Sequence, residues 1–349
     1  MSLQEVSNSS RAPHIQTSLV EVTDKLPFKP PCRILFKNEY EQPSGSFKLR
    51  GIGRLIQASI QRAIRSNEDI SKLHVFASSG GNAGLAAAYL ARFYGIRCTV
   101  ALPTVSKANV RAKLELYGAK LLIYGNNINE ADKYLKTIIA AVDHNQTIPI
   151  YCHPFDNPDI WEGHSSVIDE VATQLDKGLV SKVRGIVCSV GGGGLYNGIY
   201  KGIQQNNMTL DVILVECNEA PTFSETIKAN KIVTLNSVKS VATSLACSHL
   251  NNKSLEYYHN NSIIKTHYHP ITDNDAIRGS VQFYDTFGTV VEPACGAAVC
   301  TVFNQMEALT NSLEHLSPDD IVVIVVCGGL CSSFEDIVEF KRLLRSSRL

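Results

Sequence analysis

The chain has 349 residues, of which 44% are hydrophobic and 19% are charged. This balance is typical of a folded globular protein and excludes a disordered chain, and the length predicts two domains. Lys and Arg together number 33, as do Asp and Glu. A neutral chain gives no electrostatic reason to expect a nucleic acid as partner. No apolar run is long enough to span a membrane, so no membrane partner is expected.

Ten cysteines lie at scattered spacings. Such spacing does not resemble a disulfide framework and favours a reducing compartment, so a cytoplasmic location is expected. The first residues lack the apolar stretch of a secretory signal. The last three residues, Ser347, Arg348 and Leu349, are a variant of the SKL peroxisomal address, and a peroxisomal location is the alternative.

Short β-branched runs alternate with helical sequence along the chain. The runs occupy residues 74–78, 97–103, 120–125, 185–190, 211–216 and 321–327. Continuous apolar runs between helices are typical of buried strands in parallel sheets, which predicts an α/β protein with open, doubly wound sheets. Prolines in TIPIYCHPFDNP (147–158) indicate one boundary. We therefore expect a small substrate-side domain at 46–148 and a large cofactor-binding domain formed by 1–45 with 149–349.

The stretch PSGSFKLRG (43–51) places Lys48 between Phe47 and Leu49, behind small polar residues. Partial burial lowers the pKa of a lysine and suits one that forms a Schiff base. The alternative is a solvated lysine in the first turn of a helix.

The stretch SSGGNAG (78–84) follows a predicted strand and opens an alanine-rich helix. Glycines allow a ligand close to the backbone, and amides at a helix start can hold a carboxylate. Ser79 and Asn82 add a hydroxyl and an amide. The alternative is a serine N-cap followed by a tight glycine turn.

The stretch GGGGLYNG (191–198) also lies between a strand and a helix. Four glycines cost backbone entropy, and a cradle of amides around a phosphate accounts for them. A dinucleotide is the alternative, with Glu216 at the end of the next strand as a ribose ligand, as in an NAD-dependent oxidoreductase. However, Tyr196 and Asn197 occupy the positions where the G-x-G-x-x-G pattern requires its last glycine.

Cys327 ends the last apolar run, ahead of two glycines in VVCGG. With Cys331 it suggests a metal or redox pair, but no second pair accompanies it, and a buried structural thiol is the alternative. Combined, the four stretches supply a sheltered lysine, a phosphate cradle, a carboxylate loop and a polar atom at a strand tip. These are the groups that pyridoxal phosphate (PLP) needs when it acts on an amino acid.

Seven motifs occur in the order in which the catabolic L-serine/L-threonine dehydratases carry them. They are PSGSFKLRG, SSGGNAGLAAAYLAR, WEGHSSVIDE, GGGGL, SVATSLA, VEPACGAA and VVCGG. The chain resembles this family of fold-type II PLP enzymes from about residue 17 to residue 333. The resemblance implies two open, mostly parallel twisted sheets flanked by helices, as in the tryptophan synthase β subunit. It also implies a homodimer.

The resemblance also implies residue roles. Lys48 would form the Schiff base with PLP and take the α-proton, Phe47 and Ser244 would face the two sides of the ring, and Cys327 would face the pyridine nitrogen. The phosphate would lie on Gly191, Gly192, Gly193, Gly194 and Leu195. Ser79, Gly80, Gly81 and Asn82 would bind the substrate carboxylate, with Asn82 also at the ring 3′-oxygen. A monovalent cation such as K⁺ would lie at the Glu216 side chain and the carbonyls of Gly191, Ala220, Leu245 and Cys247.

The implied reaction is β-elimination, which gives pyruvate and ammonia from L-serine, and 2-oxobutanoate and ammonia from L-threonine. A serine racemase or a β-replacement enzyme is the alternative within the fold, which the weakly acidic Cys327 thiol disfavours. Two departures from the family pattern stand out. Ser244 replaces a small apolar residue, and Thr17-Ser18-Leu19 replaces Thr-Pro-Leu. The chain has no room for the regulatory domain of biosynthetic threonine deaminases, so feedback control by isoleucine is not expected.

Overall fold

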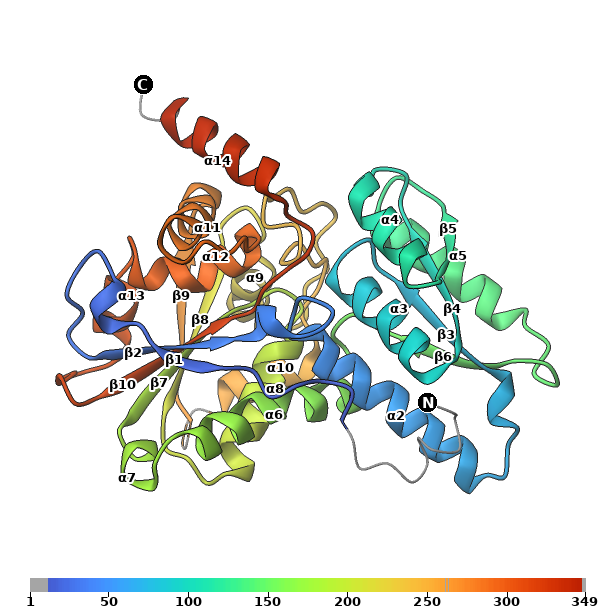
Figure 1. Cartoon of the computed structure of the whole chain (residues 1–349), viewed down its shortest axis with the longest axis horizontal. Helices are drawn as coiled ribbons and strands as arrows, with labels where there is room; N and C mark the ends of the chain where they lie inside the picture. Colours follow the sequence, from blue (N-terminus) through green and yellow to red (C-terminus); the bar gives the residue numbers. More distant parts are fainter. Residues whose placement is uncertain (1–11, 261, 263, 347–349) are drawn as a thin grey trace. The chain divides into compact units, whose positions relative to one another are not determined.

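The computed structural model describes residues 12–260, 262 and 264–346. The chain forms two compact units, and Figure 1 shows the elements of each. Unit 1 contains Gln42–Gly163 and the described residues up to Ile15, and unit 2 contains Gln16–Glu41 and the chain from His164 onward. Among the described residues, no helix combines the length and the apolar character needed to cross a membrane.

Unit 1 is built on a parallel sheet of four strands in the order β5-β4-β3-β6. The strands are β3 (Leu73–Ser78), β4 (Arg97–Leu102), β5 (Lys120–Ile123) and β6 (Ile148–Cys152). The first three lie on the apolar runs from which the sheet was predicted. Pro149 lies in β6, an edge strand that pairs only with β3. An edge strand tolerates a residue without an N–H group, so Pro149 does not end the unit.

Four helices flank this sheet, namely α2 (Lys48–Arg65), α3 (Asn82–Tyr94), α4 (Ala108–Leu116) and α5 (Ile128–Ala140). Helices α2 and α3 pack together, while α5 packs on β3 and β4. Phe76 of β3 forms a buried cluster with Ala131 and Leu135 of α5. Side chains alternate across a strand, so Ser78 lies on the same face of β3 as Phe76 and faces α5.

Unit 2 is built on a sheet of six strands in the order β1-β2-β10-β7-β8-β9. The strands are β1 (Leu19–Glu21), β2 (Arg33–Asn38), β7 (Val183–Ser189), β8 (Asp211–Cys217), β9 (Thr266–Ile271) and β10 (Ile321–Val326). Only β1 pairs antiparallel. All six residues of β10 are buried, as a continuous apolar run predicts for a strand covered on both faces. The expected fold class, α/β with two mostly parallel sheets flanked by helices, is confirmed.

The helices of unit 2 cover this sheet. They are α6 (Pro158–Gln174, which begins in unit 1), α7 (Lys177–Val180), α8 (Gly194–Gln205), α9 (Thr222–Ala229), α10 (Asn252–His259), α11 (Asp273–Phe287), α12 (Pro293–Val299), α13 (Glu307–Ser312) and α14 (Phe334–Ser346). Helix α12 packs on β7, β8 and β10, and α11 packs between α12 and α14. Four short 3₁₀ segments complete the described elements: Thr23–Lys25, Glu39–Glu41, Ile70–Lys72 and Cys300–Val302.

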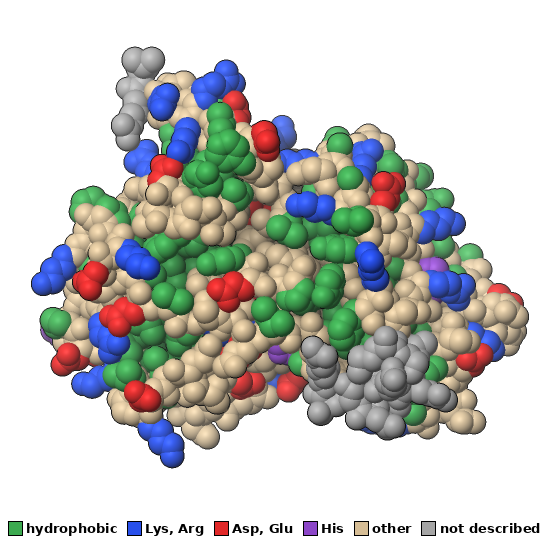
Figure 2. Space-filling model, in the orientation of Figure 1, with side chains coloured by type: hydrophobic (Ala, Val, Ile, Leu, Met, Phe, Trp, Pro, Cys, Tyr) green, Lys and Arg blue, Asp and Glu red, His purple; other side chains and the backbone are tan. Residues whose placement is uncertain are grey.

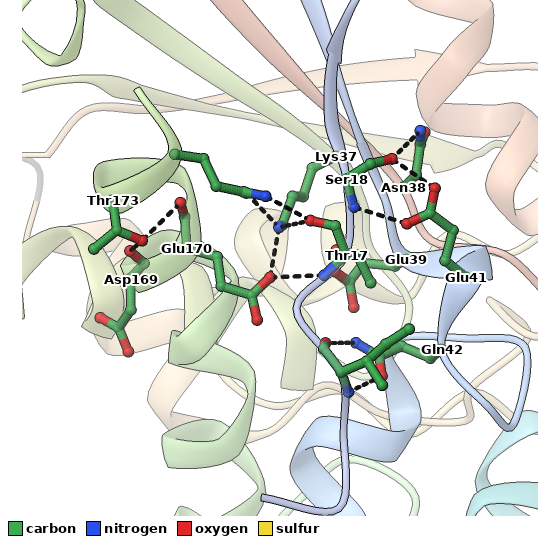
Figure 3. Close-up of polar contacts among 12 residues, drawn as sticks. Thr17, Ser18, Lys37, Asn38, Glu39, Glu41, Gln42, Asp169, Glu170 and Thr173 are labelled. Atoms are coloured by element: carbon green, nitrogen blue, oxygen red, sulfur yellow. Dashed lines mark hydrogen bonds and ion pairs between the residues drawn. The ribbon is translucent and has the colours of Figure 1, made fainter. Parts of the chain in front are cut away.

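A buried polar network holds the first residues of unit 2, and Figure 3 shows it. Lys37 of β2 is fully buried, and its Nζ lies 2.5 Å from Glu170 Oε2 and donates to the Thr17 carbonyl at 2.8 Å. The Ser18 amide and hydroxyl donate to the two Glu41 carboxylate oxygens at 2.7 and 2.5 Å. A proline at position 18 could make neither bond. Polar contacts therefore hold the segment in which the family pattern has a proline.

The chain passes between the units after residues 15, 41 and 163, whereas the sequence placed the boundaries after residues 45 and 148. The difference at the second boundary follows from β6, which keeps the proline-containing segment in unit 1. The assignment of cofactor and substrate to different domains stays a prediction.

On the face that Figure 2 shows, acidic and basic side chains are interspersed, in keeping with the neutral composition.

The imidazole of His74 on β3 is half-buried and makes two contacts. It stacks on Phe76 with the ring centroids 4.2 Å apart, and its Nε2 lies 2.8 Å from Thr99 Oγ1. Burial, with smaller contributions from Arg97 and Lys120, lowers the pKa of His74 from 6.5 to about 4. The unfolded chain therefore binds more protons than the folded chain between these two values.

Consequently, the contribution of His74 to stability is present above pH 6.5 and is lost as the pH falls toward 4. We expect the temperature of the unfolding midpoint to decrease as the pH is lowered from about 7 to about 5. The decrease should be smaller in His74→Gln, which keeps a polar group near Thr99 but does not titrate. Equal shifts in the two proteins would show that His74 does not produce the effect.

Candidate functional site

Lys48 is the first residue of α2, and Phe47 is the residue before the helix. Lys48 is half-buried. Its Nζ donates to the Pro154 carbonyl at 2.6 Å and lies 5.0 Å from the centroid of the Phe47 ring. The hydroxyls of Ser44 and Ser46, which precede Lys48 in the chain, are buried and find no hydrogen-bond partner among the described residues. Lys48 does lie in the first turn of a helix, as the alternative expects, but its ammonium group is partly buried and hydrogen-bonded to the backbone. Buried hydroxyls without partners indicate a place that a polar ligand completes.

Residues 79–82 form the turn between β3 and α3. A Cβ atom at Gly80 would lie 2.5 Å from Ser106 Oγ, so the turn is closely packed. The N-cap residue of α3 is Gly81, and no side chain caps the helix. Ser79 instead accepts a hydrogen bond from the Gly81 amide at 3.2 Å. The alternative of a serine N-cap is therefore not what the turn shows, and the start of α3 is suited to an anion.

A polar group that sequence reasoning missed holds the strand tip before this turn. The Ser78 hydroxyl and the Tyr151 hydroxyl both donate to Asp132 Oδ1 at 2.5 Å. Lys136 Nζ lies 2.7 Å from the other carboxylate oxygen. Burial alone would raise the pKa of Asp132, but the bonds from Lys136, Ser78 and Tyr151 hold it below its ordinary value. Asp132 is therefore a charged anchor for the end of β3.

The glycine turn in unit 2 follows β7 and opens α8. Gly191, Gly192, Gly193 and Gly194 are buried. Gly193 has φ +87°, and a Cβ atom there would lie 2.1 Å from Ser254 Oγ. A Cβ atom on Gly191 would lie 2.8 Å from the Leu245 carbonyl oxygen. Packing therefore accounts for two of the four glycines, Gly191 and Gly193, and the turn leaves backbone amides at a helix start.

The segment before Leu245 forms a turn in which the Leu245 amide donates to the Ala242 carbonyl at 2.8 Å. This turn includes Ser244, and the next residue, Leu245, lies close to Gly191. Cys327 follows β10 and is buried, with Sγ 3.9 Å from Ser189 Oγ at the end of β7. Contact with the Cys295 thiol and burial raise the pKa of the Cys327 thiol well above its ordinary value. Cys327 is thus a neutral thiol.

Glu216 is fully buried at the end of β8. Its carboxylate accepts hydrogen bonds from the Phe223 and Ser224 amides at 2.5 and 3.1 Å, at the start of α9, and from the Tyr268 hydroxyl at 3.3 Å. Burial raises the pKa of Glu216 to about 7, although these amides oppose the shift. A carboxylate enclosed in this way cannot bind the ribose of a dinucleotide, so that alternative loses its acid.

The expected carbonyl ligands gather near the same helix. Thr222 contacts two of them: its hydroxyl donates to the Cys247 carbonyl at 2.6 Å, and its amide donates to the Ala220 carbonyl at 2.9 Å. The Leu245 carbonyl, which packs against Gly191, accepts from the Cys247 amide at 2.7 Å. The structure thus places Ala220 and Cys247 at the start of α9, beside Glu216. In the described part of the chain, no cluster of three or more His, Cys, Asp or Glu side chains is suited to a metal ion.

The predicted residues divide between the units along the chain. Phe47, Lys48 and residues 79–82 belong to unit 1. Gly191 to Leu195, Glu216, Ala220, Ser244, Leu245, Cys247 and Cys327 belong to unit 2. Asp132 and Tyr151 carried no sequence signal because each is one polar residue in an ordinary helix or strand. Asn251 and Ser254, which contact the glycine turn, have only the spacing of a helix N-cap.

The role of Asp132 as an anchor leads to a prediction. Ser78→Ala removes the hydroxyl that links β3 to Asp132, and we expect amide hydrogen exchange of residues 79–82 to become faster by up to about tenfold. Thr99→Val is the matched control, because it removes a hydroxyl contact, to His74, near the opposite end of the same strands. If both variants accelerate exchange in the turn equally, Asp132 has no specific role there.

Comparison with known proteins identifies the family of the chain. The family described as pyridoxal-phosphate dependent enzyme matches residues 13–328. The chain is 42% identical over 323 residues to the catabolic L-serine/threonine dehydratase of Saccharomyces cerevisiae, covering 90% of this chain and 87% of that protein. It is 34% identical over 310 residues to the L-serine dehydratase/L-threonine deaminase of Bos taurus, covering 88% and 89%.

Among solved structures, the chain is similar to a fungal L-serine ammonia-lyase from Rhizomucor miehei. The TM-score is 0.83 at 28% sequence identity, and the match covers 95% of this chain and 99% of that one. A maize serine racemase with 20% identity and a TM-score of 0.76 shares the fold. The expected resemblance is confirmed, and the chain belongs to the family of pyridoxal-phosphate dependent enzymes.

Proposed function

We propose that this chain is a lyase of amino-acid catabolism, a PLP-dependent L-serine/L-threonine ammonia-lyase. The observation that carries the proposal is Lys48, half-buried at the start of α2 beside two buried hydroxyls without partners, in a chain 42% identical to a catabolic L-serine/threonine dehydratase. The products would be pyruvate and ammonia from L-serine, and 2-oxobutanoate and ammonia from L-threonine.

The residues present fit the cofactor. Gly191 to Gly194 and Leu195 form a turn of closely packed glycines at the start of α8, which suits a phosphate. Cys327 would contact the pyridine nitrogen, Phe47 and Ser244 would face the ring, and Lys48 would hold the aldehyde carbon as a Schiff base. When bound, PLP supplies an electron sink for the negative charge that develops at the substrate Cα.

The side chains and backbone would then do the following. Ser79 and the amides of Gly80 and Gly81 would hold the substrate carboxylate at the uncapped start of α3, with Asn82 next to them. Lys48 would take the proton from Cα. The β-hydroxyl would leave as water with a proton from a nearby acid, which balances the proton taken by Lys48, and hydrolysis of the released aminoacrylate would give the 2-oxo acid and ammonia. The neutral Cys327 thiol is too weak an acid to protonate the ring nitrogen, which favours this elimination over racemisation.

Replacing the lysine tests this proposal. With L-serine or with L-threonine, we expect the wild-type protein to release one ammonia for each 2-oxo acid. Lys48→Ala should lower the rate of release of both products by about 10³-fold or more. Lys133→Ala on α5 is the control, since Lys133 is an exposed lysine of the same unit. If the wild type binds PLP but forms no 2-oxo acid, the ammonia-lyase proposal fails. Racemisation and β-replacement would then be assayed.

We also propose that Glu216 binds a monovalent cation such as K⁺, with the carbonyls of Gly191, Ala220, Leu245 and Cys247. The support is the fully buried Glu216 carboxylate, which among the described residues accepts hydrogen bonds only from uncharged amides and a hydroxyl. A buried carboxylate is stable only when its charge is compensated or removed. One carboxylate with several carbonyl oxygens suits a singly charged ion.

The cation proposal predicts a stability effect that depends on ion size. Replacing Li⁺ by K⁺ at constant ionic strength should raise the midpoint of thermal unfolding by several degrees, because an ion that binds only the folded chain stabilises it. Glu216→Gln should remove the difference between the two salts. Asp211→Asn, at the opposite end of β8, is the control and should keep it. An equal response of wild type and Glu216→Gln would contradict the proposal.

We further propose a homodimer in the cytoplasm. For the homodimer, the support is that helix α14 carries apolar side chains on its surface, visible in Figure 2, of which Phe334 and Val338 are each 53% exposed.

For the cytoplasm, the support is that all ten cysteines are described and none forms a disulfide, in keeping with a reducing compartment. The alternative peroxisomal address, Ser347 to Leu349, lies outside the described residues.

A further inference from the structure

Three buried polar side chains lie behind the glycine turn of unit 2. They are Asn197 of α8, Asn251 immediately before α10, and Ser254 in the first turn of α10, and each is at most 1% exposed. Asn197 Nδ2 donates to Asn251 Oδ1 at 2.7 Å, and the Ser254 hydroxyl donates to Asn197 Oδ1 at 2.7 Å. The three side chains therefore form one connected network, which we call the asparagine network.

The asparagine network binds the carbonyl groups of the glycine turn. Asn251 Nδ2 donates to the Gly192 carbonyl at 2.7 Å, and the Asn251 amide donates to the same oxygen at 3.3 Å. The Ser254 hydroxyl lies 3.3 Å from the Gly193 carbonyl, which also accepts from the Asn197 amide at 2.9 Å. The Gly192 carbonyl is thus held by Asn251 beside α10, and the Gly193 carbonyl is held by the first bond of α8 together with Ser254.

The direction of the carbonyls determines the direction of the amides. In a planar trans peptide the C=O and the next N–H point in opposite directions, and the described residues contain no cis peptide bond. Because the Gly192 carbonyl points toward Asn251, the Gly193 amide points away from α10. The Gly193 carbonyl accepts the first intrahelical bond of α8 and contacts Ser254, so the Gly194 amide points out of the start of α8. Within the described chain, neither of these two amides donates to a backbone carbonyl.

Helix capping alone does not account for this arrangement. Asn251 is the N-cap of α10, and its Oδ1 accepts from the Ser254 amide at 2.9 Å. A cap needs only that oxygen, for which serine serves nearly as well as asparagine. The bond that Asn251 donates to Gly192, the bond from Asn197, and the Ser254 hydroxyl, whose single proton lies between Asn197 and the Gly193 carbonyl, are all additional. They cost the burial of several polar groups, and their shared target is the glycine turn.

We infer that Asn197, Asn251 and Ser254 are positioning residues for the cofactor phosphate, which hold the Gly193 and Gly194 amides in the direction needed to bind it. This inference rests on the role of the glycine turn in the proposed function. The network contacts neither the substrate nor the reacting atoms. Its effect is on the affinity for the phosphate group, through a backbone prepared before the cofactor binds.

The test compares two ligands on the full chain after removal of bound cofactor. PLP and pyridoxal share the ring and the aldehyde, but pyridoxal lacks the phosphate. Dissociation constants for both are measured from the absorbance of the Schiff base. The variants are Asn251→Ser, which keeps a helix cap but loses the donor to Gly192, and Ser254→Ala, which keeps the amide that Asn251 caps. Asn127→Ser is the control, because Asn127 caps α5 in the other unit.

We expect each variant to weaken PLP binding by about tenfold and to leave pyridoxal binding unchanged, as the loss of one or two positioning hydrogen bonds implies. The control should change neither constant. The inference is overturned if both variants weaken PLP and pyridoxal equally, which indicates a structural role, or if neither constant changes. Two variants are used so that a folding defect in one leaves the other to decide.

This test is separate from the test of the reaction. A wild-type protein that binds PLP much more tightly than pyridoxal, but forms no 2-oxo acid, contradicts the ammonia-lyase proposal and leaves the phosphate comparison intact. A wild type that binds the two equally well contradicts the role of the glycine turn, and the asparagine network then has no phosphate to position.

Discussion

A glycine turn can bind an anion only if its own carbonyl oxygens are held away from it, and unit 2 meets this constraint with buried side chains. The turn follows β7, an inner strand of the sheet, and opens α8, so its two ends are fixed by the sheet and by the helix. Between these ends Gly193 requires a positive φ. Without partners for the carbonyls of Gly192 and Gly193, a chain of glycines would sample many orientations. The asparagine network removes that freedom.

The two units use carboxylates in opposite ways. Asp132 has a lysine and two hydroxyls around it, and these hold its pKa below the ordinary value. It therefore stays charged and anchors the end of β3. Glu216 is enclosed by neutral donors, and burial raises its pKa to about 7. The first environment is complete within the described chain, whereas the second lacks positive charge. This contrast is why a cation is proposed at Glu216 and not at Asp132.

Sequence patterns predicted the parts of the fold that depend on local chemistry. Apolar runs such as that of β10 indicate buried parallel strands wherever they occur, and glycines at strand ends indicate turns. The patterns did not predict β6 as part of unit 1, because Pro149 suggests a boundary until the strand is known to lie at a sheet edge. Nor did they predict the partners of the turns. Asn251 follows Gly192 by 59 residues and Asp132 follows Ser78 by 54, and only the tertiary fold brings such residues together.

In the proposed function, the thiol at position 327 would connect the fold to the choice of reaction. Its high pKa arises from contact with Cys295 of α12 and from burial at the end of β10. Helix α12 can bring that thiol near only because it packs directly on β7 and β10, and its small residues, PACGAAV, allow this close packing. A neutral thiol at the proposed place beside the pyridine nitrogen would donate at most a weak hydrogen bond and no proton. Negative charge at the substrate Cα would then be stabilised less within the ring, so that expulsion of the β-hydroxyl becomes the faster outcome. The same packing that buries β10 would thereby favour elimination over racemisation.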